Sequence, residues 1–205
     1  MNLVQSLRKF NRKERYWLLQ NALGEKFYSL DKKFVGRLNG ILAAKGIAVP
    51  TDAYWALDYH FDWLAGAIAD FHGLAAQKRR FENPPDDQAH FGERLVQGNQ
   101  EDVDLLVAFD KTLILIECKA DTSWSTQQFS SKLGRIESLK RFASIHDTEM
   151  EIAFVIISPN PTSLKADWFE LEIYERPSFL RVERCDANGN ASADGLFWQV
   201  KSTGG

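Results

Sequence analysis

Three charged residues at the ends of two apolar runs are the part of this sequence best suited to chemistry. Asp104 precedes the apolar run 105–109, while Glu117 and Lys119 follow the run 113–116. Carboxylate oxygens are ligands for hard divalent cations. Burying three such charges is costly unless a metal ion or a substrate engages them. The residues therefore predict a small acidic site with a lysine at its side.

The two apolar runs predict a β-hairpin that brings these residues together. The polar break at residues 110–112 is typical of a turn between two strands. Side chains alternate along a strand, so Glu117 and Lys119 are expected on one side of the sheet and Cys118 on the other. Asp104 begins the partner strand, where it is expected to face Glu117.

The same segment resembles the restriction-endonuclease-like nuclease superfamily, which is named after its PD-(D/E)XK pattern. The matching residues are Val103-Asp104 and, after twelve intervening residues, Glu117-Cys118-Lys119. Val103 replaces the proline of the family pattern. The resemblance implies a nuclease that hydrolyses phosphodiester bonds, with DNA favoured over RNA. By this resemblance, Asp104, Glu117 and the backbone carbonyl of Cys118 would bind Mg²⁺ or Mn²⁺. Lys119 would activate or orient the attacking water.

The helix expected after the hairpin supplies further candidates. By the same resemblance, Gln128 would border the active site as a fourth catalytic residue, with Gln127 as its reserve. Lys132 and Arg135 are expected on the same flank of the helix, where they would contact phosphate. A solvated helix face explains these two residues equally well. Trp124 is more simply a packing residue than a platform for a base.

Other acidic residues compete for the metal-ligand role. Asp102 is expected on the same strand face as Asp104. We prefer Asp104 because it abuts the apolar run directly. Relatives place another acid on the helix before the sheet, and Asp58, Asp62 and Glu93 are the candidates for it. Exposed acids on a helix also occur without any function.

A basic cluster near the N-terminus is a second candidate for nucleic-acid contact. Its members are Arg8, Lys9, Arg12, Lys13 and Arg15. Such a cluster can bind a nucleic-acid backbone electrostatically. The solvated face of an amphipathic helix accounts for it more simply.

The elements expected around the site alternate between helices and strands. Apolar periodicity and capping residues predict helices over about residues 4–24, 29–46, 50–73 and 125–144. Strands are expected at 93–98, 105–109, 113–116 and 152–158, and a terminal hairpin pairs 179–184 with 196–201. A loop is predicted over residues 79–92, and residues 164–174 are expected to be helical or irregular.

This order predicts an α+β fold with a mixed central sheet flanked by helices. It also matches the helix, three strands, helix, strand order of the nuclease superfamily, over a core of about residues 53–158. The expected domain spans residues 51–205 and ends in the hairpin at 177–201. Residues 1–50 are expected to form a helical addition.

Composition limits the partners and the compartment. The chain has 25 Lys and Arg residues against 28 Asp and Glu residues, a net charge of −3, so a nucleic acid would have to meet a local basic patch. Two cysteines without metal-ligand spacing argue against a disulfide scaffold and a structural zinc site. No signal peptide or membrane-spanning run is evident, which predicts a cytoplasmic protein without a membrane partner. A homodimer is compatible with a nuclease that cuts two strands.

Two other classes of protein stay open. The first is a catalytically inactive nuclease fold that binds nucleic acid or a protein partner. The second is an unrelated α+β protein in which the hairpin is purely structural. That second class predicts that Asp104 and Glu117 lie far apart or that each is paired with a lysine or arginine.

Overall fold

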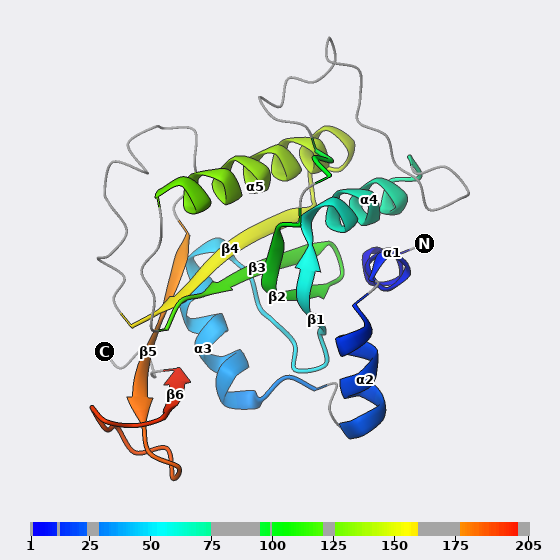
Figure 1. The fold of residues 1–205 in the computed structure, drawn as a ribbon. Helices are drawn as coiled ribbons and strands as arrows, with labels where there is room; N and C mark the ends of the chain where they lie inside the picture. Colours follow the sequence, from blue (N-terminus) through cyan, green and yellow to red (C-terminus); the bar gives the residue numbers. More distant parts are fainter. Residues whose placement is uncertain are drawn as a thin grey trace.

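One mixed β-sheet forms the centre of the molecule (Figure 1). The computed structural model describes residues 2–11, 13–23, 29–74, 95–98, 100–120, 126–159 and 177–200. Eight side chains in these ranges lie outside the description: Tyr16, Trp17, Gln20, Leu23, Thr126, Gln127, Gln128 and Phe197. Within the described residues the sheet has six strands, and their spatial order equals their order in the chain.

The strands combine an antiparallel half with a parallel half. They are β1 (Tyr54–His60), β2 (Asp102–Phe109), β3 (Thr112–Cys118), β4 (Glu151–Ser158), β5 (Ser178–Cys185) and β6 (Phe197–Val200). Strands β1, β2 and β3 are antiparallel neighbours, β4 and β5 continue parallel to β3, and β6 returns antiparallel to β5. The predicted mixed sheet and both predicted hairpins are therefore confirmed.

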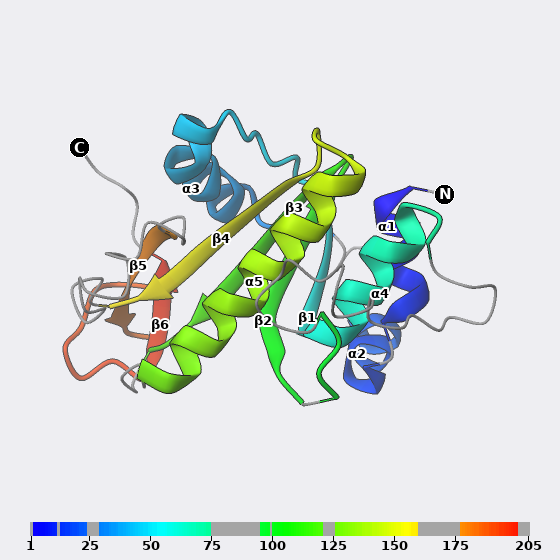
Figure 2. The same ribbon diagram turned by 90° about the horizontal axis from the view of Figure 1, so that it is seen from above.

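Helices cover both faces of this sheet. They are α1 (Leu3–Phe10), α2 (Glu14–Leu23), α3 (Lys32–Leu42), the short 3₁₀ helix η2 (Ala43–Lys45), α4 (Phe61–Phe71) and α5 (Thr126–His146). Helices α4 and α5 lie over one face, whereas α3 lies on the other (Figures 1 and 2). Helix α1 packs against α4 beside the β1 edge. No helix in the described part of the chain has the length and apolar character needed to cross a membrane.

The predicted helix over residues 50–73 is wrong in its first half. Residues Tyr54–His60 form strand β1, and helix α4 begins only at Phe61. His60 ends the strand and caps the helix, since its Nδ1 accepts a hydrogen bond from the amide of Asp62 at 3.2 Å. Leu57 belongs to this strand and is 36% exposed. The strand predicted at 93–98 is not present in its described part, residues 95–98. Strand β1 occupies the place beside β2 instead.

The predicted N-terminal helix is also divided. Asn11 ends α1, and its side chain accepts a hydrogen bond from the amide of Lys13 at 3.1 Å before α2 begins. The helices predicted over residues 29–46 and 125–144 agree better with the structure. Asp31 caps α3 through the amides of Lys33 and Phe34, and the helix predicted after the hairpin is α5. The predicted elements at 79–92 and 164–174 lie outside the described residues.

Helices α1 and α4 approach so closely that one glycine is required between them. A Cβ atom added at Gly66 of α4 would lie 2.6 Å from Cε1 of Phe10, a buried ring at the end of α1. We expect Gly66→Ala to lower the free energy of unfolding by about 1–3 kcal/mol, because an overpacked core must shift. Gly36→Ala in α3 is the matched control. No atom lies within 4 Å of its added Cβ, so it should instead raise stability by about 0.5–1 kcal/mol. Urea denaturation measures both, and an equal gain in the two variants would contradict the close packing.

Candidate functional site

The hairpin brings Asp104 and Glu117 to facing positions on adjacent strands. Leu105 pairs with Ile116, and the same antiparallel register places Asp104 opposite Glu117 one step further along. The Oδ2 atom of Asp104 accepts a hydrogen bond from the backbone amide of Cys118 at 2.7 Å, which ties the first acid to the strand that carries the second. The expectation that the two acids face each other agrees with this geometry.

Lys119 follows the last residue of β3 and remains next to the acids. Its backbone amide donates to the carbonyl of Ile157 at 2.9 Å, so the ladder between β3 and β4 fixes the main chain here. The Lys119 side chain is half-buried, and its charge lowers the pKa of Glu117. All three residues of the predicted motif therefore gather at one end of the hairpin.

Glu117 is the most deeply buried acid of the site. Its side chain is 2% exposed, and burial raises its pKa from 4.5 to about 7. This value also includes a lowering of the pKa by the ammonium groups of Lys132 and Lys119 and a smaller rise caused by the negative charge of Asp104. A carboxyl group in this position is poised between its protonated and ionised forms near neutral pH.

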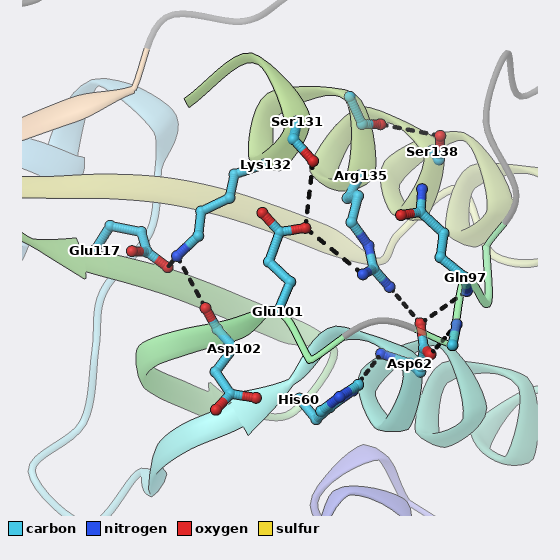
Figure 3. Close-up of polar contacts among 12 residues, drawn as sticks. His60, Asp62, Gln97, Glu101, Asp102, Glu117, Ser131, Lys132, Arg135 and Ser138 are labelled. Atoms are coloured by element: carbon cyan, nitrogen blue, oxygen red, sulfur yellow. Dashed lines mark hydrogen bonds and ion pairs between the residues drawn. The ribbon is translucent and has the colours of Figure 1, made fainter. Parts of the chain in front are cut away.

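Lys132 of α5, which was predicted to contact phosphate, instead contacts Glu117. Its Nζ lies 2.5 Å from Oε1 of Glu117 and donates a hydrogen bond to the main-chain carbonyl of Asp102 at 2.9 Å (Figure 3). The ammonium therefore joins β2 and β3 from above the sheet. This ion pair was missed because nothing in the local pattern of α5 distinguishes Lys132 from an exposed lysine.

Arg135, one turn further along α5, is buried in a second network. Its Nη2 lies 2.5 Å from Oδ1 of Asp62, and its Nη1 lies 3.6 Å from Oε2 of Glu101 (Figure 3). Asp62 also accepts hydrogen bonds from the amides of Gln97 and Gly98 at 3.1 and 2.8 Å. Because Arg135 is only 3% exposed, this placement argues against the predicted phosphate contact. The residue links α5, α4 and the segment before β2.

The remaining acidic candidates have partners of their own. Asp62 belongs to the Arg135 network. Asp58 lies on β1 with a positive φ of 48°, and its carboxylate is 2.8 Å from Nη2 of Arg15. Asp102 begins β2 and is 2.6 Å from Nζ of Lys13. Glu93 lies outside the described residues. The two carboxylates that meet at the hairpin are thus Asp104 and Glu117.

The N-terminal basic cluster is largely directed at acids of the same chain. Lys9 forms an ion pair with the buried Asp70, and Lys13 and Arg15 pair with Asp102 and Asp58. Arg8 lies over the ring of Tyr54 at 5.3 Å. Arg12 lies outside the described residues. These contacts attach the N-terminal segment to β1, β2 and α4, which favours the structural explanation of the cluster.

The donor atoms at the end of the hairpin suit a hard divalent cation. Mg²⁺ is commonly held by one or two carboxylates, with water and phosphate oxygens completing its shell. Among the described residues, Oε1 of Glu117 is buried and receives no hydrogen bond of regular geometry, although the Lys132 ammonium lies beside it. No group of three or more acid, histidine or cysteine side chains suited to a metal occurs in the described part of the chain. Two carboxylates would therefore need oxygen ligands from the main chain, water or substrate.

An apolar hollow near the hairpin lies on the other face of the sheet. A cavity of about 520 Å³ is lined by Leu57 and Leu105 together with residues from the start of α3. Leu105 alternates with Asp104 along β2, so this cavity does not belong to the acidic site.

Two predicted residues of the site lie beyond what the structure describes. The side chains of Gln128 and Gln127 at the start of α5 are outside the description, as is Trp124. Comparison of the chain with protein-family models, with curated proteins and with solved structures found no match. The superfamily resemblance and the role of Gln128 therefore stay predictions.

Proposed function

We propose that this protein is a metal-dependent nuclease that hydrolyses phosphodiester bonds, with DNA as the favoured substrate. The observation that carries the proposal is the meeting of Asp104 with the buried Glu117 at the end of a hairpin, beside Lys119. The negative charge of Asp104 opposes the ionisation of Glu117, and a bound divalent cation would offset that cost.

The strand order supports the proposal at the level of the fold. A meander of β1, β2 and β3 is followed by α5 and by β4, which is parallel to β3. The elements from β1 to β4 resemble the restriction-endonuclease-like core predicted over residues 53–158, except that its first helix, α4, follows β1 instead of preceding it. Fold likeness alone does not define a reaction, so the residues of the site have to bear the functional argument.

Each residue of the site has a distinct role in the proposed reaction. Asp104, Glu117 and the carbonyl of Cys118 would hold Mg²⁺ or Mn²⁺ through oxygen atoms. A bound divalent cation supplies Lewis acidity toward phosphate oxygens. The Lys119 ammonium orients the attacking water and offsets the negative charge that gathers on the phosphate. Burial of Glu117 excludes competing solvent from the inner side of the site.

The test is cleavage of plasmid, linear DNA, single-stranded DNA and RNA with Mg²⁺ or Mn²⁺. We expect Lys119→Ala and Asp104→Asn each to slow cleavage by about a hundredfold or more, as is usual when charge stabilisation is lost. Asp194→Asn, at an exposed position between β5 and β6, is the charge-matched control and should cleave normally. Thermal unfolding checks that each variant folds. Cleavage at the wild-type rate by both site variants would refute the assignment.

A catalytically inactive nuclease fold that binds nucleic acid or a protein is the second candidate. The contact between Lys132 and Glu117 favours it, because an ammonium already neutralises one of the two acids. Metal titration separates the candidates. The nuclease should bind Mg²⁺ or Mn²⁺ in a manner that Asp104→Asn weakens, whereas the inactive fold should bind neither.

A further inference from the structure

We propose that Lys132 is a tethered counterion for Glu117, which a divalent cation must displace in order to bind. This inference rests on the proposed function, since it concerns the same two carboxylates. It assigns Lys132 a positioning role. The lysine holds the Glu117 carboxylate in place without metal and sets how strongly the site binds a cation.

The first support is the position of the ammonium group. Nζ of Lys132 is 2.5 Å from Oε1 of Glu117, the buried oxygen that receives no regular hydrogen bond among the described residues. A cation that binds Glu117 through Oε1 would occupy the same region as this ammonium. Two positive groups on one carboxylate oxygen repel each other strongly where water is excluded. The lysine and the metal ion are therefore competitors.

The second support is that the ammonium is held by more than one partner. The carbonyl of Asp102 accepts a hydrogen bond from Nζ at 2.9 Å, and the Lys132 side chain is only 16% exposed (Figure 3). A lysine attracted to an acid at the surface would keep most of its side chain in water. Here the side chain crosses from α5 to two strands, and it satisfies one acceptor on each.

The third support is that release of Lys132 leaves the surroundings intact. Arg135, one turn along α5, anchors the helix to α4 and to the segment before β2 through Asp62 and Glu101. The four-carbon stem of lysine is flexible, so the ammonium can swing away while the helix remains fixed. Displacement thus requires the movement of one side chain.

Amine labelling provides the direct test. The wild-type protein is acetylated briefly at pH 8.5, with and without saturating Mg²⁺, and each lysine is quantified by peptide mass spectrometry. We expect Mg²⁺ to accelerate modification of Lys132 by about tenfold, because an amine held in an ion pair is protected. Lys140 on the same helix is the internal control, and its rate should not change.

Calorimetric titration with Mg²⁺ at the same pH provides an independent test. We expect Lys132→Met to bind Mg²⁺ about tenfold more tightly than the wild type, which corresponds to about 1.4 kcal/mol. Lys140→Met removes one charge from the same helix and should stay within about twofold. Binding by Lys132→Met alone, with none by the wild type, would also support the competition.

The outcomes separate this inference from the proposed function. If the wild type binds Mg²⁺ while Lys132 stays protected and Lys132→Met binds no more tightly, the counterion role is refuted and the nuclease proposal stands. An equal gain in Lys140→Met would likewise refute it, because the effect would then reflect overall charge. If neither the wild type nor Lys132→Met binds Mg²⁺, both proposals fail.

Discussion

Replacing Arg135 with methionine is expected to lower the free energy of unfolding by about 3–5 kcal/mol, the usual cost of removing one member of a buried ion pair. Methionine retains much of the apolar stem but leaves Asp62 and Glu101 without their shared cation. Those two carboxylates are only 12% and 16% exposed, so water replaces the guanidinium poorly. The contact between the guanidinium and the Phe61 ring, at 4.9 Å, is lost as well.

Arg141→Met is the matched control for this effect. Arg141 lies on the same helix and contacts Glu137 one turn away at 3.3 Å, but its side chain is 42% exposed. Exposed pairs of this kind contribute only about 0.3–0.5 kcal/mol. Urea denaturation at pH 7 measures both variants. A loss below about 1 kcal/mol for Arg135→Met would mean that its network is effectively solvated.

The strands around the site could be predicted because their signals are local. Residues 105–109 and 113–116 are apolar runs bounded by polar residues. The first run lies in strand β2 and the second in strand β3. The alternation of side chains along these strands is also local, and it correctly placed Asp104 opposite Glu117. Helix α5 and strand β4 followed from similar patterns of apolar spacing and of ending residues.

Strand β1 could not be predicted in this way because two elements share one apolar pattern. Leu57 and Phe61 are four residues apart, as on a helix, yet Leu57 belongs to β1 and Phe61 begins α4. The change at His60 depends on a cap that uses a ring nitrogen and on pairing with Asp102 of a distant strand. Tertiary pairing overrides helical spacing at this point.

The ion pairs of the site could not be predicted from the sequence because their partners are far apart in the chain. Arg135 and Asp62 are 73 residues apart, and their contact depends on how α5 crosses α4. Lys132 and Arg135 resemble exposed basic residues in sequence, but both turn toward the sheet side of α5 and meet acids there. Charge patterns alone do not reveal which charged residues are buried, because burial is decided by the packing of the neighbouring elements.

The pH dependence of stability should report directly on Glu117. In metal-free buffer, we expect the wild type to lose roughly 2–3 kcal/mol of stability relative to Glu117→Gln between pH 5 and pH 8. The pKa of this carboxyl is raised from 4.5 to about 7 in the folded chain, chiefly by burial. Between these values the folded state binds the proton that the unfolded state has released. The stabilising contribution is therefore complete below about pH 4.5 and is lost as the pH rises through about 7.

Comparison with a neutral variant isolates this effect, because glutamine does not titrate but keeps an oxygen acceptor near Lys132. Ile116→Val, at the adjacent buried position of β3, is the control. It should cost about 0.5–1.5 kcal/mol at every pH, because it removes a methylene group and no proton. Urea denaturation at pH 5, 6, 7 and 8 gives the three curves. If the stability of the wild type relative to Glu117→Gln stays constant or rises between pH 5 and pH 8, the folded protein does not raise the pKa of Glu117. In that case the attraction of Lys132 for the ionised Glu117 would outweigh the effects of burial and of the Asp104 charge.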